Sequence, residues 1–283
     1  MTKKLGIITG DGRFPVILAA SARENGFSVV AVAHTGLSSQ DIEKVAERTH
    51  WINVGEVSRL VEIFKSEGIT EAIMAGGVSK GLMFRNIKPD LRALSLLFKL
   101  KDRKDDTILR ALANELEKEG IMIREATTYV KSILAGDEVL TRRTPSEEEW
   151  RDIAFGMKIA KEIGRLDIGQ CIVVKNCAVL AVEAIEGTDE AIRRGGRLAN
   201  GGAVVVKICK PGQDIRFDLP TIGPGTIETM KEVAARILAV EAGMTVVIDR
   251  EAMIKSADAA GITVVGIQGG KGGFDRGPSD DKS

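Results

Sequence analysis

A carboxylate beside a Gly-rich turn is the feature of this chain best suited to chemistry on a phosphate. Asp218 lies between two apolar residues, and Pro220 favours an extended backbone at the residue before it. A Thr-Ile-Gly-Pro-Gly-Thr turn follows and is expected to open a helix at about Thr226. Free backbone N–H groups and the partial positive charge of a helix start attract phosphate. The acid can hold a cation or position a water; alternatively, it only bonds its own loop.

A second candidate segment is Ala181–Gly196, A-V-E-A-I-E-G-T-D-E-A-I-R-R-G-G. It is expected to form a buried strand followed by Gly-Thr-Asp at a helix start. Thr188 can donate to a phosphate oxygen, and Asp189 can share a metal or hold a water. Either side chain can instead cap the helix, which is the simpler account of each taken singly.

Composition excludes several classes of function. The 283 residues are 44% hydrophobic, which favours a globular chain long enough for two domains. Lys+Arg and Asp+Glu are equal at 40 each, and aromatic residues make up 4%, so neither a basic face nor stacking platforms for nucleic acid are expected. No run of about 18 apolar residues predicts a membrane span. Lys3 and Lys4 are not followed by the apolar core of a signal peptide.

The histidines and cysteines limit the choice of metal. The only histidines are His34 and His50, which are too few for a His-rich dinuclear phosphoesterase site. The three cysteines, at 171, 177 and 209, lack C-x-x-C spacing, and we expect reduced thiols of a cytoplasmic protein. A metal would therefore have oxygen ligands, which favours Mg²⁺.

The N-terminal part alternates short apolar strands with helices, which predicts a parallel sheet covered on both faces. The expected strands are 5–9, 29–33, 51–54, 72–75 and 121–125, and the expected helices end near 25, 67 and 120. Ligands of such sheets bind at the carboxyl ends of the strands. The loops Gly10–Pro15 and Gly76–Lys80 fall there.

The loop G-D-G-R-F-P at 10–15 is not a complete dinucleotide-binding motif. Its third Gly is absent, and no acid follows the second strand, which runs into His34-Thr35-Gly36. A nicotinamide enzyme lacks support because the carboxylate that would bind the ribose is missing. A phosphate or nucleotide contact by this loop is the favoured interpretation.

The segment Leu82–Lys104 combines Leu residues at helical spacing with a cluster of Lys and Arg. One interpretation is an amphipathic helix on an anionic membrane or beside acyl chains. The other is a helix packed on the sheet, which periodicity by itself favours.

A break at residues 135–147 separates the two predicted domains. Gly, Asp, Thr, Pro and Ser interrupt the pattern there, and S-E-E-E then starts a helix with acids in its first turn. We therefore expect an N-terminal Rossmann-like domain (1–134), a linker (135–147) and a C-terminal α/β domain with a mixed sheet (148–283). The expected C-terminal strands are 171–175, 178–184, 203–208, 245–249 and 263–267, and the helices after the first are 188–194 and 226–242.

Motifs spread over almost the whole chain resemble one family, the UDP-2,3-diacylglucosamine pyrophosphatases of lipid A biosynthesis that are unrelated to calcineurin-like metallophosphoesterases. The markers are G-D-G-R-F-P (10–15), A-G-G-V-S-K (75–80), Asp105-Asp106, L-T-R-R-T-P (140–145), L-D-I-G-Q (166–170), E-A-I-E-G-T-D (183–189) and D-L-P-T-I-G (218–223). The last two are the most specific. Gly81 and Lys104 stand where the family tends to have Pro and Gly.

The resemblance implies Mg²⁺-dependent hydrolysis of UDP-2,3-diacylglucosamine to UMP and 2,3-diacylglucosamine 1-phosphate, with water attacking the sugar-side phosphorus. We expect the ligand site between the domains, because inter-domain clefts are common ligand sites. The expected location is cytoplasmic and peripheral to the inner membrane, with no nucleic-acid partner and with a homodimer as a candidate assembly. Asp218 is the candidate catalytic acid, and Asp218 and Asp189 are the candidate metal ligands. The candidate substrate-binding residues are Gly10, Asp11, Gly12, Phe14, Gly76, Gly77, Lys80, Gln170, Thr188, Asp189, Lys207, Lys210, Thr221 and Gly223. A non-catalytic nucleotide or lipid carrier and a nicotinamide-dependent enzyme are the alternatives.

Overall fold

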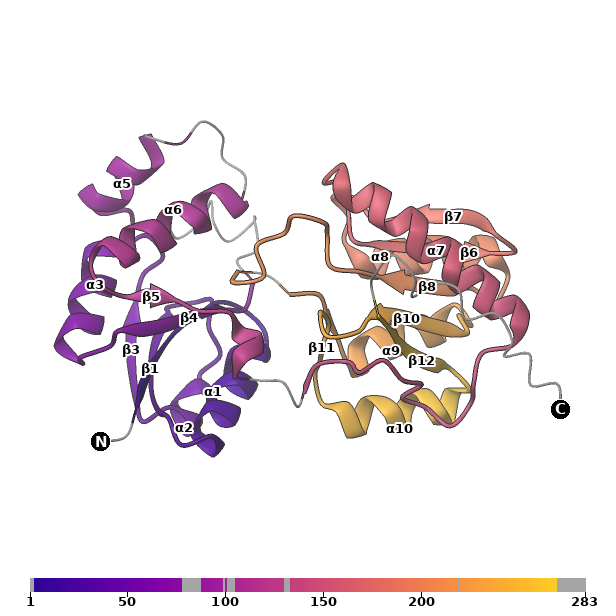
Figure 1. Ribbon diagram of the computed structural model, residues 1–283, viewed down its shortest axis with the longest axis horizontal. Coiled ribbons are helices and arrows are strands. Elements are labelled where there is room, and N and C mark those ends of the chain that lie inside the picture. Colours follow the sequence, from indigo (N-terminus) through magenta and orange to yellow (C-terminus); the bar gives the residue numbers. More distant parts are fainter. Residues whose placement is uncertain are drawn as a thin grey trace, which may run out of the picture. The chain divides into compact units, whose positions relative to one another are not determined.

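The computed structural model describes residues 3–77, 88–98, 100, 105–129, 133–217 and 219–268. The chain divides into two compact units, each described here by itself (Figure 1). Unit 1 comprises 1–131 together with 214–218, and unit 2 comprises 132–213 and 219–283. Within the described residues, no helix has the length and hydropathy needed to cross a bilayer.

Unit 1 is built on a five-stranded sheet in which every pair of neighbours is parallel. The strand order is β3-β2-β1-β4-β5. The strands are β1 (Lys4–Thr9), β2 (Ser28–His34), β3 (Arg48–Ile52), β4 (Glu71–Ala75) and β5 (Met122–Ile123). The predicted Rossmann-like parallel sheet is confirmed. The third strand lies earlier than the predicted 51–54, because Arg48 and Thr49 continue its pairing with β2.

Helices cover both faces of this sheet. They are α1 (Phe14–Glu24), α2 (Ile42–Val45), α3 (Val57–Ser66), α5 (Leu91–Phe98) and α6 (Asp105–Lys118), with a 3-10 turn η1 (Ala126–Thr128). On one face, Ile8 and Val32 of the sheet pack against Phe64 of α3 and Leu116 of α6. Phe217 joins the same core from far along the chain, which explains why 214–218 belongs to unit 1.

Unit 2 contains a mixed five-stranded sheet of order β12-β10-β8-β6-β7. The strands are β6 (Cys171–Lys175), β7 (Ala178–Val182), β8 (Val204–Lys207), β10 (Ile237–Glu241) and β12 (Thr263–Ile267); β9 (Thr221–Ile222) and β11 (Val246–Val247) form a separate pair. Strand β6 is antiparallel to β7 and β8, whereas the other neighbours are parallel. The predicted mixed sheet with a hairpin is confirmed.

In the described part of unit 2, helices cover both faces of the sheet. They are α7 (Glu147–Arg165), α8 (Thr188–Ala199), α9 (Pro224–Glu232) and α10 (Arg250–Ala260). Helix α7 begins with a capping box between Ser146 and Glu149, as S-E-E-E predicts, and packs Met157 on one face of the sheet. The opposite face receives Ile192, Met230 and Met253 from α8, α9 and α10.

The single helix predicted over 226–242 is wrong, because the segment forms α9 and then strand β10. Ala234 has a φ of 50°, which ends helical geometry. The following residues, Ile237–Glu241, are all buried between β8 and β12. A short apolar run of this kind fits a buried strand and a buried helix equally well by periodicity.

Helix α8 continues past its predicted end at 194, through two glycines, to Ala199. A Cβ on Gly195 would lie 2.5 Å from the side chain of Val173, and one on Gly196 would lie 2.2 Å from Val233. These glycines therefore allow close packing of the helix on its neighbours and do not terminate it.

Candidate functional site

The two glycine loops of unit 1 meet where the strand order of the sheet reverses, beyond β1 and β4. Gly10 N donates to Ala75 O at 2.7 Å, and Asp11 N donates to Gly77 O at 2.7 Å. A Cβ on Gly10 would lie 2.5 Å from Gly77 O, and one on Gly76 would lie 2.5 Å from Asp11 O. Both glycines are therefore required by the crossing of the two loops, whatever ligand the edge binds.

The loop at Gly12 leads directly into the start of α1. Gly12 has a φ of 90° with open space around its Cα, and its N–H donates to Asp11 Oδ1 at 2.7 Å. No side chain caps α1, which begins at Phe14. Backbone N–H groups at such a helix start suit an anion. Lys80, predicted for the same edge, lies outside the described residues.

A cavity of about 420 Å³ lies in unit 1 at this edge. Its walls come from the carboxyl ends of β1, β3 and β4 and from α3, α5 and α6, together with Phe217. Most of its lining is apolar. The apolar side chains include Ile8, Ile52, Val57, Leu60, Met74, Ala93, Leu96, Leu97, Leu100, Leu109 and Leu112. Its size is in the range of small-molecule sites, roughly 300–1,000 Å³.

His34, which is not among the candidate site residues from the sequence, supplies a polar corner of the cavity. Its Nδ1 lies 2.8 Å from Thr9 O, which also accepts from Ser38 Oγ at 2.8 Å. Burial lowers the pKa of His34, against the opposing effects of Thr9 and of Glu56. Because a carbonyl can only accept, Nδ1 carries the proton and Nε2 of the neutral ring is an acceptor. The sequence could have indicated His34 as a site residue, because it is a polar residue at the end of a buried strand.

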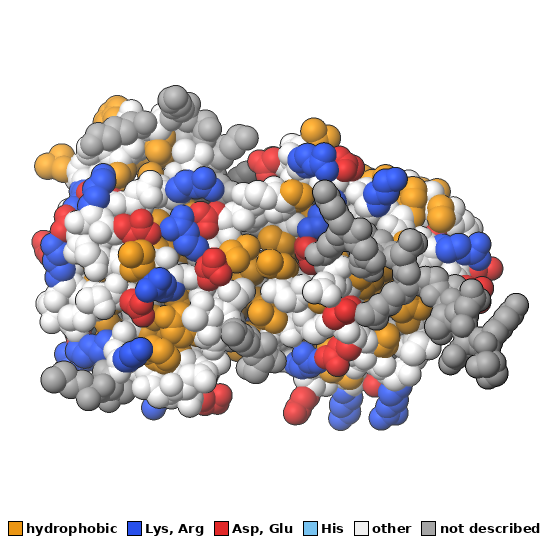
Figure 2. Space-filling model, viewed as in Figure 1, with side chains coloured by type: hydrophobic (Ala, Val, Ile, Leu, Met, Phe, Trp, Pro, Cys, Tyr) orange, Lys and Arg blue, Asp and Glu red, His pale blue; other side chains and the backbone are white. Residues whose placement is uncertain are grey.

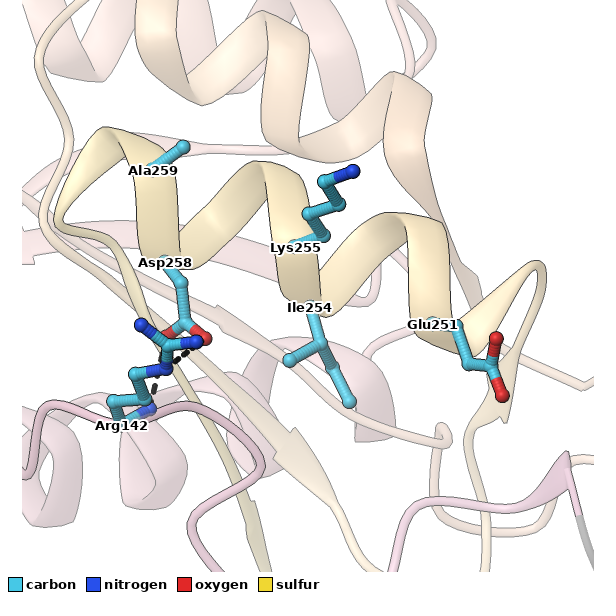
Figure 3. A pocket seen from close by; sticks show the side chains of 6 residues that line it. All are labelled: Arg142, Glu251, Ile254, Lys255, Asp258 and Ala259. Atoms are coloured by element: carbon cyan, nitrogen blue, oxygen red, sulfur yellow. Dashed lines mark hydrogen bonds and ion pairs between the residues drawn. The ribbon is translucent and has the colours of Figure 1, made fainter.

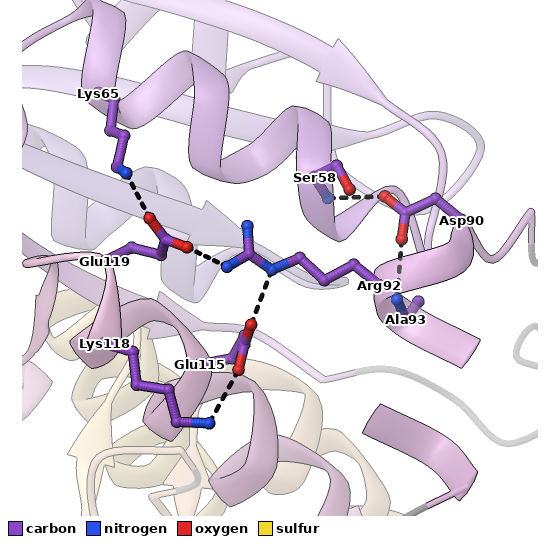
Figure 4. Close-up of polar contacts among 8 residues, drawn as sticks. All are labelled: Ser58, Lys65, Asp90, Arg92, Ala93, Glu115, Lys118 and Glu119. Atoms are coloured by element: carbon purple, nitrogen blue, oxygen red, sulfur yellow. Dashed lines mark hydrogen bonds and ion pairs between the residues drawn. The ribbon is translucent and has the colours of Figure 1, made fainter. Parts of the chain in front are cut away.

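Polar contacts hold α5 in place as one wall of the cavity (Figure 4). Asp90 accepts from Ser58 N at 2.6 Å and from Ala93 N at 2.8 Å. Arg92 bonds Glu115 of α6 and Glu119, which directly follows that helix, and Lys65 of α3 also bonds Glu119. The Lys65 and Arg92 bonds lower the pKa of Glu119 to about 2.

In unit 2, Lys207 places a buried ammonium at the carboxyl end of β8. The residue is 8% exposed, and its Nζ donates to Thr221 O at 3.0 Å. No carboxylate of the described residues forms an ion pair with it. Gly223, two residues after that acceptor, is the N-cap of α9, which has no side-chain cap. A buried cation beside an open helix start is suited to an anionic ligand.

Glu183 is a buried acid that bonds two of the predicted residues, although the sequence analysis does not list it as a site residue. Thr188 Oγ1 donates to its Oε1 at 2.9 Å, and Gln170 N donates to its Oε2 at 3.2 Å. The Gln170 Oε1 atom is buried with no partner among the described residues. The sequence did offer a signal, an acid directly after an apolar strand; that strand, β7, is mostly exposed or half-buried and not buried as expected.

Cys171 lies between these charges, because it pairs with Lys207 across β6 and β8. Burial raises the pKa of this thiol to about 12, with Lys207 opposing the shift and Glu183 and Asp189 adding to it. The thiol is therefore protonated and inert near neutral pH. Asp189, in the first turn of α8, is exposed.

The other predicted unit 2 residues have varied surroundings. Lys210 pairs with Asp167 at 2.8 Å near the surface. The described residues contain no group of three or more His, Cys, Asp or Glu arranged to hold a metal. Asp218, the candidate catalytic acid, falls outside them.

A second hollow, of about 500 Å³, runs along α10 and has no comparable chemistry. Arg142 N donates to Asp258 Oδ1 at 2.9 Å, so this pair is already satisfied. The side chains of Glu251, Ile254 and Lys255 point in different directions (Figure 3). No set of polar atoms converges on one point, and the hollow is not a candidate active site.

Comparison with known proteins matches both halves of the chain to one family. The LpxI N-terminal domain matches residues 4–133 and the LpxI C-terminal domain matches 136–265. A relative from Caulobacter vibrioides, UDP-2,3-diacylglucosamine pyrophosphatase LpxI, is 35% identical over 276 residues, which cover 94% of this chain and 98% of the relative.

Solved structures give weaker similarities. The ADP complex of an N5-carboxyaminoimidazole ribonucleotide synthetase has a TM-score of 0.30 at 14% identity, covering 61% of this chain and 32% of the other. Glycinamide-RNase-transformylase T from Mycobacterium tuberculosis has a TM-score of 0.25 at 12% identity, covering 65% and 44%. Neither score supports an argument. Because the two domain models match most of the chain and the relative matches it over nearly its full length, the chain belongs to the LpxI family.

Proposed function

We propose that this protein hydrolyses the pyrophosphate bond of UDP-2,3-diacylglucosamine. The observation that carries the proposal is the 35% identity, over 94% of the chain, with a relative named for that activity. The products would be UMP and 2,3-diacylglucosamine 1-phosphate, with water attacking the sugar-side phosphorus.

The edge of unit 2 supports a role in binding the phosphates. Pyrophosphate cleavage needs neutralisation of the leaving phosphate and an oriented water. The Lys207 ammonium and the open start of α9 at Gly223 can meet negative charge, while Thr221 positions that ammonium through its carbonyl. Thr188 and Gln170 are held by Glu183, which fixes the strand end beside them. Asp218 is proposed as the acid that orients the water.

Mg²⁺ is proposed as the cofactor, with Asp189 and Asp218 as its protein ligands. The donor set fits, because Mg²⁺ is commonly held by one or two carboxylates together with substrate phosphates, and Asp189 offers an exposed carboxylate. The bound ion would supply charge neutralisation at the pyrophosphate. In this proposal Lys207 acts beside the ion and does not replace it.

The cavity of unit 1 supports binding of an acyl group. Its lining is mostly aliphatic, and its polar part includes Glu56 and His34, whose Nε2 can accept from an amide or hydroxyl of the substrate. The loop at Gly12 and the start of α1 can contact a phosphate or the nucleotide. A diacylated substrate also motivates a location at the cytoplasmic face of the inner membrane. A homodimer is a further proposal, which sedimentation analysis tests.

Turnover of UDP-2,3-diacylglucosamine, followed by chromatography of released UMP, tests the proposal. We expect UMP release with Mg²⁺ and its loss in excess EDTA. In ¹⁸O-labelled water the label should enter 2,3-diacylglucosamine 1-phosphate and not UMP. Full activity in EDTA would contradict the metal proposal, and label in UMP would contradict attack at the sugar-side phosphorus. Binding of the UDP-lipid without UMP release would favour the alternative, a non-catalytic carrier.

A further inference from the structure

Helix α5 is apolar on two opposite faces. Its inner face lines the cavity with Ala93, Leu96 and Leu97, and Leu100 continues the same stripe. These residues recur every three or four positions, as one face of a helix requires. The apolar character of this inner stripe is therefore explained by its position in the cavity lining.

The outer face of α5 carries a second apolar stripe, Leu91, Leu94 and Phe98, with the same spacing. Their exposed fractions are 86%, 36% and 86%, and Ala93 is the one buried residue of the eight in the helix. Figure 2 shows hydrophobic side chains at the upper left, where α5 lies in Figure 1. Single exposed apolar residues are ordinary, but a stripe on one short helix is typical of an interaction surface.

The contacts of α5 keep this outer stripe facing outward. Arg92 is bonded to Glu115 of α6 and to Glu119 directly after it, and Asp90 is bonded to Ser58 N of α3. The helix is thus anchored by its polar flank and its inner face (Figure 4). In the outer stripe Leu94 is partly buried, whereas Leu91 and Phe98 are almost fully exposed.

The charge around α5 favours an anionic lipid surface as the occupant. Lys88, just before the helix, is exposed. In the sequence, Lys99–Lys104 contains four Lys or Arg and one Asp. Apolar residues beside a cationic cluster are the pattern of interfacial helices that bind anionic bilayers. A second protein copy would offer the same cationic charge and is disfavoured.

We propose that α5 docks on an anionic lipid bilayer through Leu91, Leu94 and Phe98, so that the cavity behind it receives acyl chains from the bilayer. The inference rests on the proposed function for its account of the cavity. The docking itself depends only on the surface of α5. One helix would then serve as membrane anchor and as cavity wall.

The test compares Leu91→Ser/Phe98→Ser with wild-type protein in co-sedimentation with vesicles of phosphatidylglycerol and phosphatidylethanolamine. The matched control is Met122→Ser/Leu198→Ser, which removes two exposed apolar residues elsewhere (46% and 65% exposed). Losing burial of one such side chain corresponds to roughly tenfold or more in a partition equilibrium. We therefore expect the α5 variant to lose vesicle binding at least about tenfold and the control to bind as wild type. Matching circular dichroism melts would show that each variant is folded.

Turnover separates this inference from the proposed function. The α5 variant should hydrolyse vesicle-borne substrate at least about tenfold more slowly, yet hydrolyse a short-chain, water-soluble substrate like wild type. Equal vesicle binding by the α5 variant and wild type would overturn the inference, as would a wild-type dimer that the α5 variant converts to monomer. If no substrate is hydrolysed by any protein, the proposed function fails, while the binding result still decides the role of α5.

Discussion

The two units differ at the carboxyl ends of their sheet strands: unit 1 has an apolar cavity there, and unit 2 has buried charged groups. In unit 1 the carboxyl ends of the parallel strands open on a cavity whose lining is mostly aliphatic, with His34 at one corner. In unit 2 the same ends of β8 and β10 carry buried charges, Lys207 and Glu241. Glu241 is neutralised by Lys161 at 2.7 Å, whereas Lys207 has no such partner in the described part of the chain.

The difference implies that the two edges respond differently to mutation. Binding in an apolar cavity is spread over many contacts, because hydrophobic stabilisation follows buried area. Charge stabilisation depends on a few groups held in fixed positions. Single changes in unit 2 should therefore be costly for turnover, and single changes in unit 1 should alter substrate preference.

The largest expected effect is that of removing the candidate catalytic acid. Asp218→Ala and Asp218→Asn should each lower kcat by about a hundredfold or more while the UDP-lipid still binds, because an acid that orients water or metal acts mainly on the transition state. Steady-state kinetics and equilibrium binding at saturating Mg²⁺ measure both quantities. If folded Asp218→Asn protein has the kcat of wild type, Asp218 is not catalytic and has only a structural role.

The second test contrasts two lysines at opposite ends of the antiparallel pair β6–β8. Lys207→Met should lower kcat/KM by about tenfold to a hundredfold, the range expected when a charged hydrogen bond to an anion is lost. Lys175→Met is the control, because Lys175 bonds the carbonyls of Ala199 and Gly201 at the other end of the pair. Melting curves first verify that both variants are folded. Their kcat/KM values are then compared with that of wild type. Equal losses would mean that Lys207 is structural.

A third test concerns the acid that the sequence analysis missed. Glu183→Gln keeps the shape of the side chain but weakens its bonds with Thr188 Oγ1 and Gln170 N. We expect kcat/KM to fall by about tenfold, because hydrogen bonds to a charged group contribute more than neutral ones. Unchanged kinetics combined with a lower melting temperature would assign Glu183 to stability and not to positioning.

The cavity of unit 1 can be narrowed from α5. Ala93→Phe places a ring in the lining and should lower kcat/KM for a long-chain substrate by about tenfold, the typical value of a steric change in an apolar pocket. The same variant should hydrolyse a short-chain substrate normally, which controls for folding and for the phosphate site. An equal fall in kcat/KM for both substrates would mean that this cavity does not bind the acyl chain.

The smallest expected effect is on acid stability of the α5 wall. Bonds from Lys65 and Arg92 lower the pKa of Glu119 from 4.5 to about 2 in the folded protein. A lowered folded-state pKa gives stability that is present above pH 4.5 and is lost as pH falls towards 2. The melting temperature of Glu119→Gln should therefore fall less than that of wild type over this interval. If circular dichroism melts show the same fall in melting temperature for both proteins, the ion pairs of Glu119 do not stabilise α5.

The sequence determined the fold class and most of the elements, because local patterns suffice for them. Alternating strands and helices predict the parallel sheet of unit 1, and S-E-E-E, with acids for the first turn, predicts the start of α7. Strands Cys171–Lys175 and Thr263–Ile267 have the predicted bounds, since each is a short apolar run between turn residues. The family resemblance also rested on motifs that the sequence displays directly.

Only the tertiary structure decided which residues lie together and which interpretation of a pattern applies. The run Ile237–Glu241 is a strand because β8 and β12 lie on either side of it, and no local signal encodes those neighbours. Phe217 belongs to the core of unit 1 although it follows more than eighty residues of unit 2 in the sequence. Glu183 gained its importance when Thr188 and Gln170 were brought to it. Burial and partners of a polar group depend on long-range packing, which a single sequence does not specify.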